Sequence, residues 1–264
     1  MPLIKVKNHY AIADRMGPAI SIILATYNES RNLPTLLESI DRNLSIDHQI
    51  IFVDDGSTDG TREIILDYIH QNPKSKYIFN NGKQSTLRAR AQGIKQAEGE
   101  FIVVMDSDLQ HPPELIPTFY RKLIEGCDIV IGSRYARGGS TGNRKPIRGL
   151  ISRVAGELAY LLLKSSRKTT DPTSEFFAFK AGLFKGLNEK WRGYEIHLFI
   201  LAQNLDKSVC DAPYRFRERP VGESKVTEGM GFIRAYVTEL ILAKKTELRN
   251  KKELLTKESA KGFH

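Results

Sequence analysis

The chain has 264 residues, with 40 Lys and Arg against 31 Asp and Glu, which gives a formal net charge of +9. With 41% hydrophobic and 27% charged residues, it can bury a sizeable core and is neither a disordered nor a fibrous protein. The positive balance favours anionic partners such as nucleotides, phosphorylated substrates or a membrane surface. The two cysteines, Cys127 and Cys210, lie far apart in the sequence, which predicts no disulfide framework and favours a reducing, cytosolic setting.

No apolar run has the length of a membrane-spanning helix. The longest strongly apolar run is Leu158–Leu163, far short of the roughly 18 residues that a span needs. Met1–Gly17 lacks the apolar stretch of a signal peptide. The sequence therefore predicts a protein on the cytoplasmic side, soluble or peripherally attached to a membrane, without a transmembrane helix.

Strand-like and helix-like segments alternate through the first half of the chain. Nearly continuous apolar runs rich in β-branched residues predict strands at Ala19–Thr26, Ile50–Val53, Lys76–Phe79, Phe101–Met105 and Asp128–Ile131. Helical spacing of apolar residues predicts helices at Leu33–Leu44, Thr61–His70, Leu87–Ala97 and Leu115–Glu125. This alternation predicts an α/β fold with a mainly parallel sheet flanked by helices, in which ligands bind beyond the carboxyl ends of the strands.

The second half of the chain is basic and amphipathic. Arg134–Arg153 holds six basic residues and no acidic one. Helical spacing predicts amphipathic helices at Ile147–Lys164 and Phe232–Leu248, and we expect the basic tail from Lys244 to fray. Further elements are expected at Glu175–Lys180 (strand), Glu195–Asn204 (helix) and Val209–Pro213 (strand).

The sequence Asp106-Ser107-Asp108-Leu109-Gln110 directly follows the strand at Phe101–Met105. In an extended backbone, residues two apart point to the same side, so Asp106, Asp108 and Gln110 would present oxygen atoms to one point. Hard divalent cations take oxygen ligands and keep places for water and phosphates. The competing interpretation is a polar loop that caps the following helix. The position at the end of a buried strand favours a metal site.

Two further polar groups follow the first two strands. Thr26-Tyr27-Asn28-Glu29 comes after the first strand, and Asp54-Asp55-Gly56-Ser57 after the second. Carboxylates accept hydrogen bonds from sugar hydroxyls and base NH groups, so these side chains suit a nucleotide. Ser57 or Asp59 could equally cap the next helix. That interpretation leaves the neighbouring charges of Asp54 and Asp55 unexplained.

An ordered set of motifs resembles one family. TYNE, DDGSTDGT, Ala89–Gly99, VMDSDLQHPPE and IGSRY resemble the inverting family-2 glycosyltransferases with the GT-A fold, and more narrowly the dolichyl-phosphate mannose synthases. Asp171–Ser174 and Arg217–Lys225 resemble two further segments of that subfamily. The resemblance implies an N-terminal extension over residues 1–18, a GT-A catalytic domain over 19–226, and an amphipathic basic C-terminal helix and tail over 227–264.

The resemblance also implies a role for each matching residue. Asp106, Asp108 and Gln110 would hold a divalent cation, Mg²⁺ or Mn²⁺. The nucleotide sugar would lie against Thr26, Tyr27, Glu29, Asp54, Asp55 and Asp106. The acceptor phosphate would bind Arg134, Arg148, Ser152 and Lys225, and the catalytic set would be Asp108, Arg134, Arg219 and Lys225. Glu175 stands where the subfamily usually has Gly, near the expected acceptor site, and Ala91 replaces a usual Asn.

The residues themselves favour a phosphate acceptor. A sugar hydroxyl needs a general base, and the region after Lys180 has no paired acidic motif. It offers Glu195 and His197, which fall in an apolar helical pattern that favours packing or capping. A phosphate monoester is already anionic, with a second pKa of about 6, and needs the cationic guidance that the basic segment supplies.

The expected function is therefore the inverting, metal-dependent transfer of a hexose, foremost mannose from GDP-mannose, to a membrane polyprenyl (dolichyl) phosphate. A UDP-glucose-dependent polyprenyl-phosphate glucosyltransferase is the alternative enzyme, and a catalytically silent membrane-associated scaffold is the alternative of another class. A membrane anchor subunit is a possible partner, and the apolar faces of the two amphipathic helices suit either a membrane interface or the protein's own core. Nucleic acid is not an expected partner, because Asp54, Asp55, Asp106 and Asp108 would repel phosphates.

Overall fold

The computed structural model of the chain describes residues 17–143, 146–187, 193–220 and 230–261. Within these ranges, seven strands form one sheet in the order β3-β2-β1-β4-β6-β5-β7. They are β1 (Ile20–Thr26), β2 (His48–Asp54), β3 (Lys76–Phe79), β4 (Phe101–Asp106), β5 (Ile129–Ser133), β6 (Phe177–Lys180) and β7 (Val209–Pro213). Only β6 is antiparallel to its neighbours β4 and β5 in this described sheet. The predicted mainly parallel α/β sheet is confirmed.

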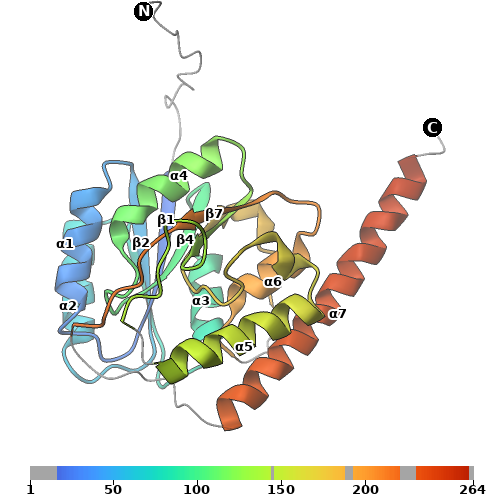
Figure 1. Cartoon of the computed structure of the whole chain (residues 1–264). Helices are drawn as coiled ribbons and strands as arrows, with labels where there is room; N and C mark the ends of the chain where they lie inside the picture. Colours follow the sequence, from blue (N-terminus) through green and yellow to red (C-terminus); the bar gives the residue numbers. More distant parts are fainter. Residues whose placement is uncertain (1–16, 144–145, 188–192, 221–229, 262–264) are drawn as a thin grey trace, which may run out of the picture.

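Helices cover both faces of the sheet (Figure 1). They are α1 (Leu33–Asn43), α2 (Thr61–Gln71), α3 (Thr86–Lys95), α4 (Ile116–Ile124), α5 (Pro146–Leu162), α6 (Ile196–Gln203) and α7 (Met230–Lys261), with 3₁₀ turns at Pro113–Leu115, Ser165–Lys168 and Ala181–Leu183. Successive strand residues point to opposite faces. Accordingly, Ile22 of β1 packs in the core with α1, α2 and α4, whereas Ile23 packs in the core with α3, α5, α6 and α7.

The C-terminal helix continues past the point where we expected fraying. α7 extends to Lys261, and its final turns project from the body of the molecule (Figure 1). The side chains of Glu247 and Asn250 hold it beyond Lys244 through hydrogen bonds. The Glu247 carboxylate accepts hydrogen bonds from the backbone N–H groups of Lys164 and Ser165, both at 3.2 Å. Asn250 donates to the carbonyl of Gln203 at 2.9 Å. The fraying prediction was wrong because these tertiary contacts add to a helical propensity that is weak by itself.

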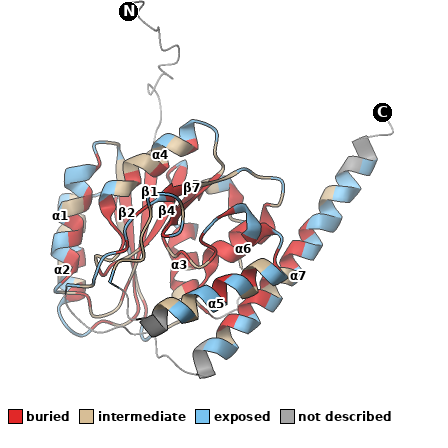
Figure 2. Ribbon diagram, viewed as in Figure 1, coloured by how far each residue is buried: buried red, intermediate tan, exposed pale blue. Residues whose placement is uncertain are grey.

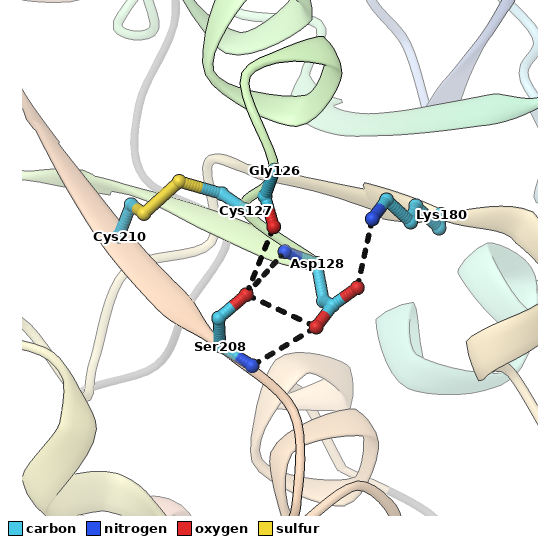
Figure 3. The surroundings of a disulfide bond; sticks show 6 residues. All are labelled: Gly126, Cys127, Asp128, Lys180, Ser208 and Cys210. Atoms are coloured by element: carbon cyan, nitrogen blue, oxygen red, sulfur yellow. Dashed lines mark hydrogen bonds and ion pairs between the residues drawn. A yellow bond between two sulfur atoms is a disulfide. The ribbon is translucent and has the colours of Figure 1, made fainter.

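The prediction of no disulfide was also wrong. Cys127 and Cys210 form a disulfide bond, with their Cα atoms 6.1 Å apart (Figure 3). Cys127 lies just before β5 and Cys210 within β7, and these strands are adjacent and parallel. Asp128 and Ser208 hold the same ends of the two strands together, since the Asp128 carboxylate accepts from the N–H of Ser208 at 3.0 Å. Sheet pairing thus joins residues 83 positions apart, and the cysteine argument for a reducing setting no longer holds.

Candidate active site

The carboxyl ends of three adjacent strands bring the predicted polar residues together. β1 lies between β2 and β4, and its register pairs Thr26 with Asp54 and Ala25 with Asp106. The TYNE, DDGS and DSDLQ loops therefore leave the sheet side by side at one edge. This is the edge at which parallel α/β sheets bind ligands.

Asp54 organises the loop in which it lies. Its side chain is fully buried and accepts hydrogen bonds from Thr26 Oγ1 at 3.1 Å, the N–H of Ser57 at 2.9 Å and Arg62 Nε at 2.9 Å. Burial raises its pKa, but the hydrogen bonds from Ser57, Arg62 and Thr26 outweigh burial and lower it. Both oxygens of Asp54 thus have protein partners, and its carboxylate stays ionised to hold the loop.

Asp55 follows β2 and is held by the loop after β3. Its carboxylate accepts from Asn80 Nδ2 at 2.9 Å and from the N–H of Gln84 at 3.1 Å. Burial raises its pKa above the usual value in spite of these bonds. The Lys83 ammonium lies 5.1 Å from the centre of the Tyr27 ring, a cation–π distance. The ends of β1, β2 and β3 thus supply an aromatic face, a cation and a carboxylate suited to a nucleotide.

The DSDLQ loop turns sharply after β4. The extended geometry expected for it ends at Asp106, and Leu109 has a left-handed backbone with φ of 66°. Asp108 accepts a hydrogen bond from the N–H of Gln110 at 3.0 Å, and Ser107 Oγ donates to the carbonyl of Ala25 at 3.0 Å. The turn, rather than strand alternation, sets the directions of these side chains.

The two carboxylates of this loop have different electrostatic surroundings. Burial opposes ionisation of Asp106, but His111 and Arg90 beside it lower its pKa; Arg90 Nη2 donates to Asp106 Oδ1 at 2.6 Å. Burial and the charge of Asp106 raise the pKa of Asp108 to about 6, although Arg219 opposes this shift. The charge of Asp106 thus adds to the cost of ionising Asp108, and a cation beside the two carboxylates would offset that cost.

The segment after β7 delivers a basic residue to this loop. The N–H of Arg217 donates to the carbonyl of Gln110 at 3.1 Å, and Gln110 Nε2 donates to the carbonyl of Arg217 at 3.2 Å. Two residues further on, the Arg219 guanidinium forms an ion pair with Asp108. The structure therefore brings together the predicted residues Asp106, Asp108, Gln110 and Arg219.

Arg134 lies in a separate buried network at the end of β5. Its Nε and Nη2 atoms donate to the two oxygens of Asp171, both at 2.7 Å, and Nη2 donates to Thr173 Oγ1 at 2.9 Å. Burial disfavours its charge, but Asp171 raises the pKa of Arg134 above its usual value. Ser152 of α5 joins the network through its hydroxyl, 3.1 Å from Thr173 Oγ1. Arg134 and Ser152 thus both contact Thr173, and Arg134 is paired with Asp171, an acidic partner that the sequence interpretation did not identify.

Two predicted residues cannot be placed, and three contributors were missed. Lys225 and the side chain of Arg148 lie outside the part of the chain that the structure describes. Sequence reasoning assigned no role to Arg90, His111 or Lys83. His111 Nδ1 accepts from the N–H of Asp106 at 3.0 Å, and its ring stacks on Phe176. Arg90 and His111 both lie within the family motifs quoted above, and those motifs were the sequence signal that could have identified them.

Comparison with known proteins identifies the family of the chain. Residues 21–190 match the description "Glycosyl transferase family 2". A dolichol-phosphate mannosyltransferase of Pyrococcus furiosus is 38% identical over 208 residues, covering 78% of this chain and 59% of that relative. A dolichol-phosphate mannosyltransferase of Saccharomyces cerevisiae is 28% identical over 224 residues, covering 80% of this chain and 82% of that relative. The chain thus spans somewhat under two thirds of the length of the archaeal relative.

Solved structures share the fold. Glucosyl-3-phosphoglycerate synthase from Mycobacterium tuberculosis in complex with UDP superimposes with a TM-score of 0.64 at 20% identity, over 87% of this chain and 81% of that one. The same enzyme in complex with Mn²⁺, UDP-glucose and phosphoglyceric acid gives a TM-score of 0.64 at 19% identity, over 87% and 80%. At this identity the likeness concerns the fold, which is that of GT-A enzymes.

Proposed function

We propose that this chain, which belongs to glycosyl transferase family 2, transfers a hexose from a nucleotide sugar to a polyprenyl phosphate. The observation that carries the proposal is the meeting of Asp106 and Asp108 with Arg219 at the carboxyl edge of the sheet, next to the TYNE and DDGS loops. The names of the relatives support mannose as the sugar and dolichyl phosphate as the acceptor. We take GDP-mannose as the donor.

The residues at the DSDLQ loop fit a divalent cation. They offer two carboxylates and a carboxamide oxygen, the hard ligands that Mg²⁺ and Mn²⁺ prefer. The raised pKa of Asp108, which burial and the charge of Asp106 cause, indicates that the pair favours an added positive charge. Asp106, Asp108 and Gln110 would hold the ion. When bound, it would stabilise the charge of the departing nucleoside diphosphate.

The remaining groups act on the donor and the acceptor. Tyr27, Asp55 and Lys83 would hold the nucleoside, while Asp54 keeps their loops in place. Arg219 would guide the acceptor phosphate, whose own oxygen attacks the anomeric carbon with inversion. Because that oxygen is already anionic, no general base is required. Arg148, Ser152 and Lys225 remain our proposed acceptor contacts.

This function is tested by transfer from radiolabelled GDP-mannose and UDP-glucose to a polyprenyl phosphate in detergent, with Mg²⁺, Mn²⁺ or EDTA. We expect a labelled lipid from GDP-mannose, abolished by EDTA. A lipid product from UDP-glucose alone would overturn the choice of mannose. Failure to bind either nucleotide sugar would overturn the proposal as a whole.

The proposed acceptor lies in a membrane, and two helices have suitable surfaces. In the described residues, no helix has both the length and the apolar character needed to cross a bilayer. α5 and α7 pack on the core through one face, with Tyr236 Oη donating to the carbonyl of Ala155 at 2.9 Å. Their outer faces are exposed (Figure 2) and carry the large apolar side chains Leu150, Val154, Leu161, Ile233, Val237, Ile241 and Leu248. We propose that these faces rest on the membrane surface.

Replacing Leu150, Leu161, Ile233 and Ile241 together by Ser is expected to weaken binding to anionic phospholipid vesicles by at least about tenfold, because full burial of even one leucine-sized side chain contributes about 1.5–3 kcal/mol and about 1.4 kcal/mol is a factor of ten. Co-sedimentation measures the effect. Leu66→Ser with Ile124→Ser is the matched control, since these side chains are 44% and 55% exposed on α2 and α4. Equal binding of the two variants would contradict the proposed orientation.

A further inference from the structure

A second group of ligating side chains lies beneath the Asp171–Ser174 loop. Glu175 precedes β6, while Glu195 and His197 lie at the start of α6, and one ligand atom of each lies within 4.8 Å of the others. His197 Nδ1 is 3.5 Å from Glu175 Oε1 and 3.4 Å from Glu195 Oε2. Glu195 and His197 are buried, and the Glu175 side chain, 18% exposed, connects the group to solvent.

The converging atoms lack hydrogen-bond partners. Glu175 Oε1, Glu195 Oε2 and His197 Nδ1 are all buried without one. Glu195 is the N-cap residue of α6, but its side chain makes no capping hydrogen bond, so of the two expected roles, packing or capping, it does not have the second. Unpaired buried polar atoms are costly, and three in one place indicate a missing ligand.

The hydrogen bond of the His197 ring and the atoms that face its other nitrogen indicate the charge of that ligand. His197 Nε2 lies 2.9 Å from the carbonyl of Pro172 and donates to it, which leaves a lone pair on Nδ1 directed at two carboxylate oxygens. A lone pair facing two carboxylates is repulsive unless a cation lies between them.

We propose that Glu175, Glu195 and His197 bind a zinc ion. Zn–N and Zn–O bonds are about 2.0–2.2 Å, which places the ligand atoms of a tetrahedral site about 3.3–3.6 Å apart. The two separations from His197 Nδ1, 3.4 and 3.5 Å, match this spacing. One imidazole and two carboxylates form a donor set that suits Zn²⁺, and the Pro172 carbonyl orients the imidazole as metal-bound histidines require. Water would take the fourth position.

The group is separate from the DSDLQ loop but linked to it. Arg90 contacts Glu175 through Oε2, which leaves Glu175 Oε1 for the zinc, and its other terminal nitrogen donates to Asp106. Arg134 and Asp171 also act electrostatically on Glu195, and Glu239 adds a carboxylate oxygen without a hydrogen-bond partner nearby. Because the two groups share no ligand, zinc binding can be measured without reference to glycosyl transfer.

The test is a cobalt titration of the full chain after removal of metals with EDTA, followed by visible absorption and by displacement with Zn²⁺. Tetrahedral Co²⁺ absorbs far more strongly than octahedral Co²⁺ on oxygen ligands, which separates this group from the DSDLQ loop. We expect one equivalent of strongly absorbing Co²⁺ in the wild type and in the control Asp108→Asn. Glu195→Gln and His197→Asn should bind at least about tenfold more weakly.

Thermal unfolding supplies a second measurement that does not depend on spectra. Zn²⁺ should raise the Tm of the wild type and of Asp108→Asn, and raise the Tm of Glu195→Gln by a smaller amount at the same Zn²⁺ concentration. Absence of the strong cobalt bands from the wild type would overturn the proposal. So would their loss in Asp108→Asn with retention in Glu195→Gln. If Glu195 and His197 share a proton and bind no zinc, the strong cobalt bands would be absent from the wild type. Glu195→Gln would then be as stable as the wild type in EDTA.

Discussion

Asp108→Asn is expected to reduce glycosyl transfer by about 10³-fold while leaving the fold intact. The substitution keeps the shape of the side chain and removes the charge that faces Arg219 and the proposed cation. Stabilisation of the departing diphosphate is worth several kcal/mol, and each 1.36 kcal/mol changes the rate tenfold. Initial rates with labelled GDP-mannose at saturating Mg²⁺ measure the effect.

The control for this substitution is Asp67→Asn, the same chemical change at an exposed position of α2. It should leave the rate unchanged. The stability of Asp108→Asn should stay close to that of the wild type, because loss of the Arg219 ion pair is offset by relief of the repulsion between Asp106 and Asp108. A rate close to that of wild type in Asp108→Asn would remove this loop from the proposed mechanism.

Arg134→Ala is expected to lower the free energy of unfolding by about 3–5 kcal/mol, the cost of leaving one member of a buried ion pair without its partner. Arg134 is 5% exposed and Asp171 is fully buried, so the stranded carboxylate has no access to water. The Asp171–Ser174 loop would lose its anchor, since Arg134 also donates to the carbonyl of Thr173 at 2.9 Å. Urea unfolding of the purified chain measures the change.

Two further variants separate the structural role of Arg134 from acceptor binding. Arg137→Ala, an exposed arginine in the same loop, should change stability by less than about 0.5 kcal/mol. Arg134→Lys keeps the charge but not the two-pronged geometry, and should recover only part of the stability. If Arg134 acted only on the acceptor phosphate, Arg134→Ala would unfold like the wild type, and only its KM for polyprenyl phosphate would rise.

Local patterns in the sequence were sufficient to predict most elements of the fold. β1 and β4 begin and end within about one residue of the predicted runs, because a buried parallel strand is apolar along its whole length. The predicted binding residues follow strand ends, and parallel strands bring those ends to one edge. Asp54 and Asp106 could therefore be placed near each other before their strands were known to flank β1.

The family motifs extended this prediction to residues that no periodicity identifies. Arg219 lies 111 positions from Asp108, and only the resemblance assigned both to one site. The structure brings them into contact because the segment after β7 runs along the DSDLQ loop. For Asp54 the motif predicted a nucleotide-binding loop, while the contacts of its oxygens came from the structure.

The sequence by itself determined the alternation of strands and helices and the edge of the sheet at which the candidate site lies. It also determined which residues make up the acidic DSDLQ loop. Only the tertiary structure decided the partners of Cys127, Arg134 and Glu175. The partners of Cys127 and Arg134 come from segments next to β5 in the sheet, with β6 inserted antiparallel between β4 and β5, and those of Glu175 come from α3 and α6. Periodicity reports which face of an element is buried. It carries no information on which distant segment covers that face, and so these pairings became visible only in the folded chain.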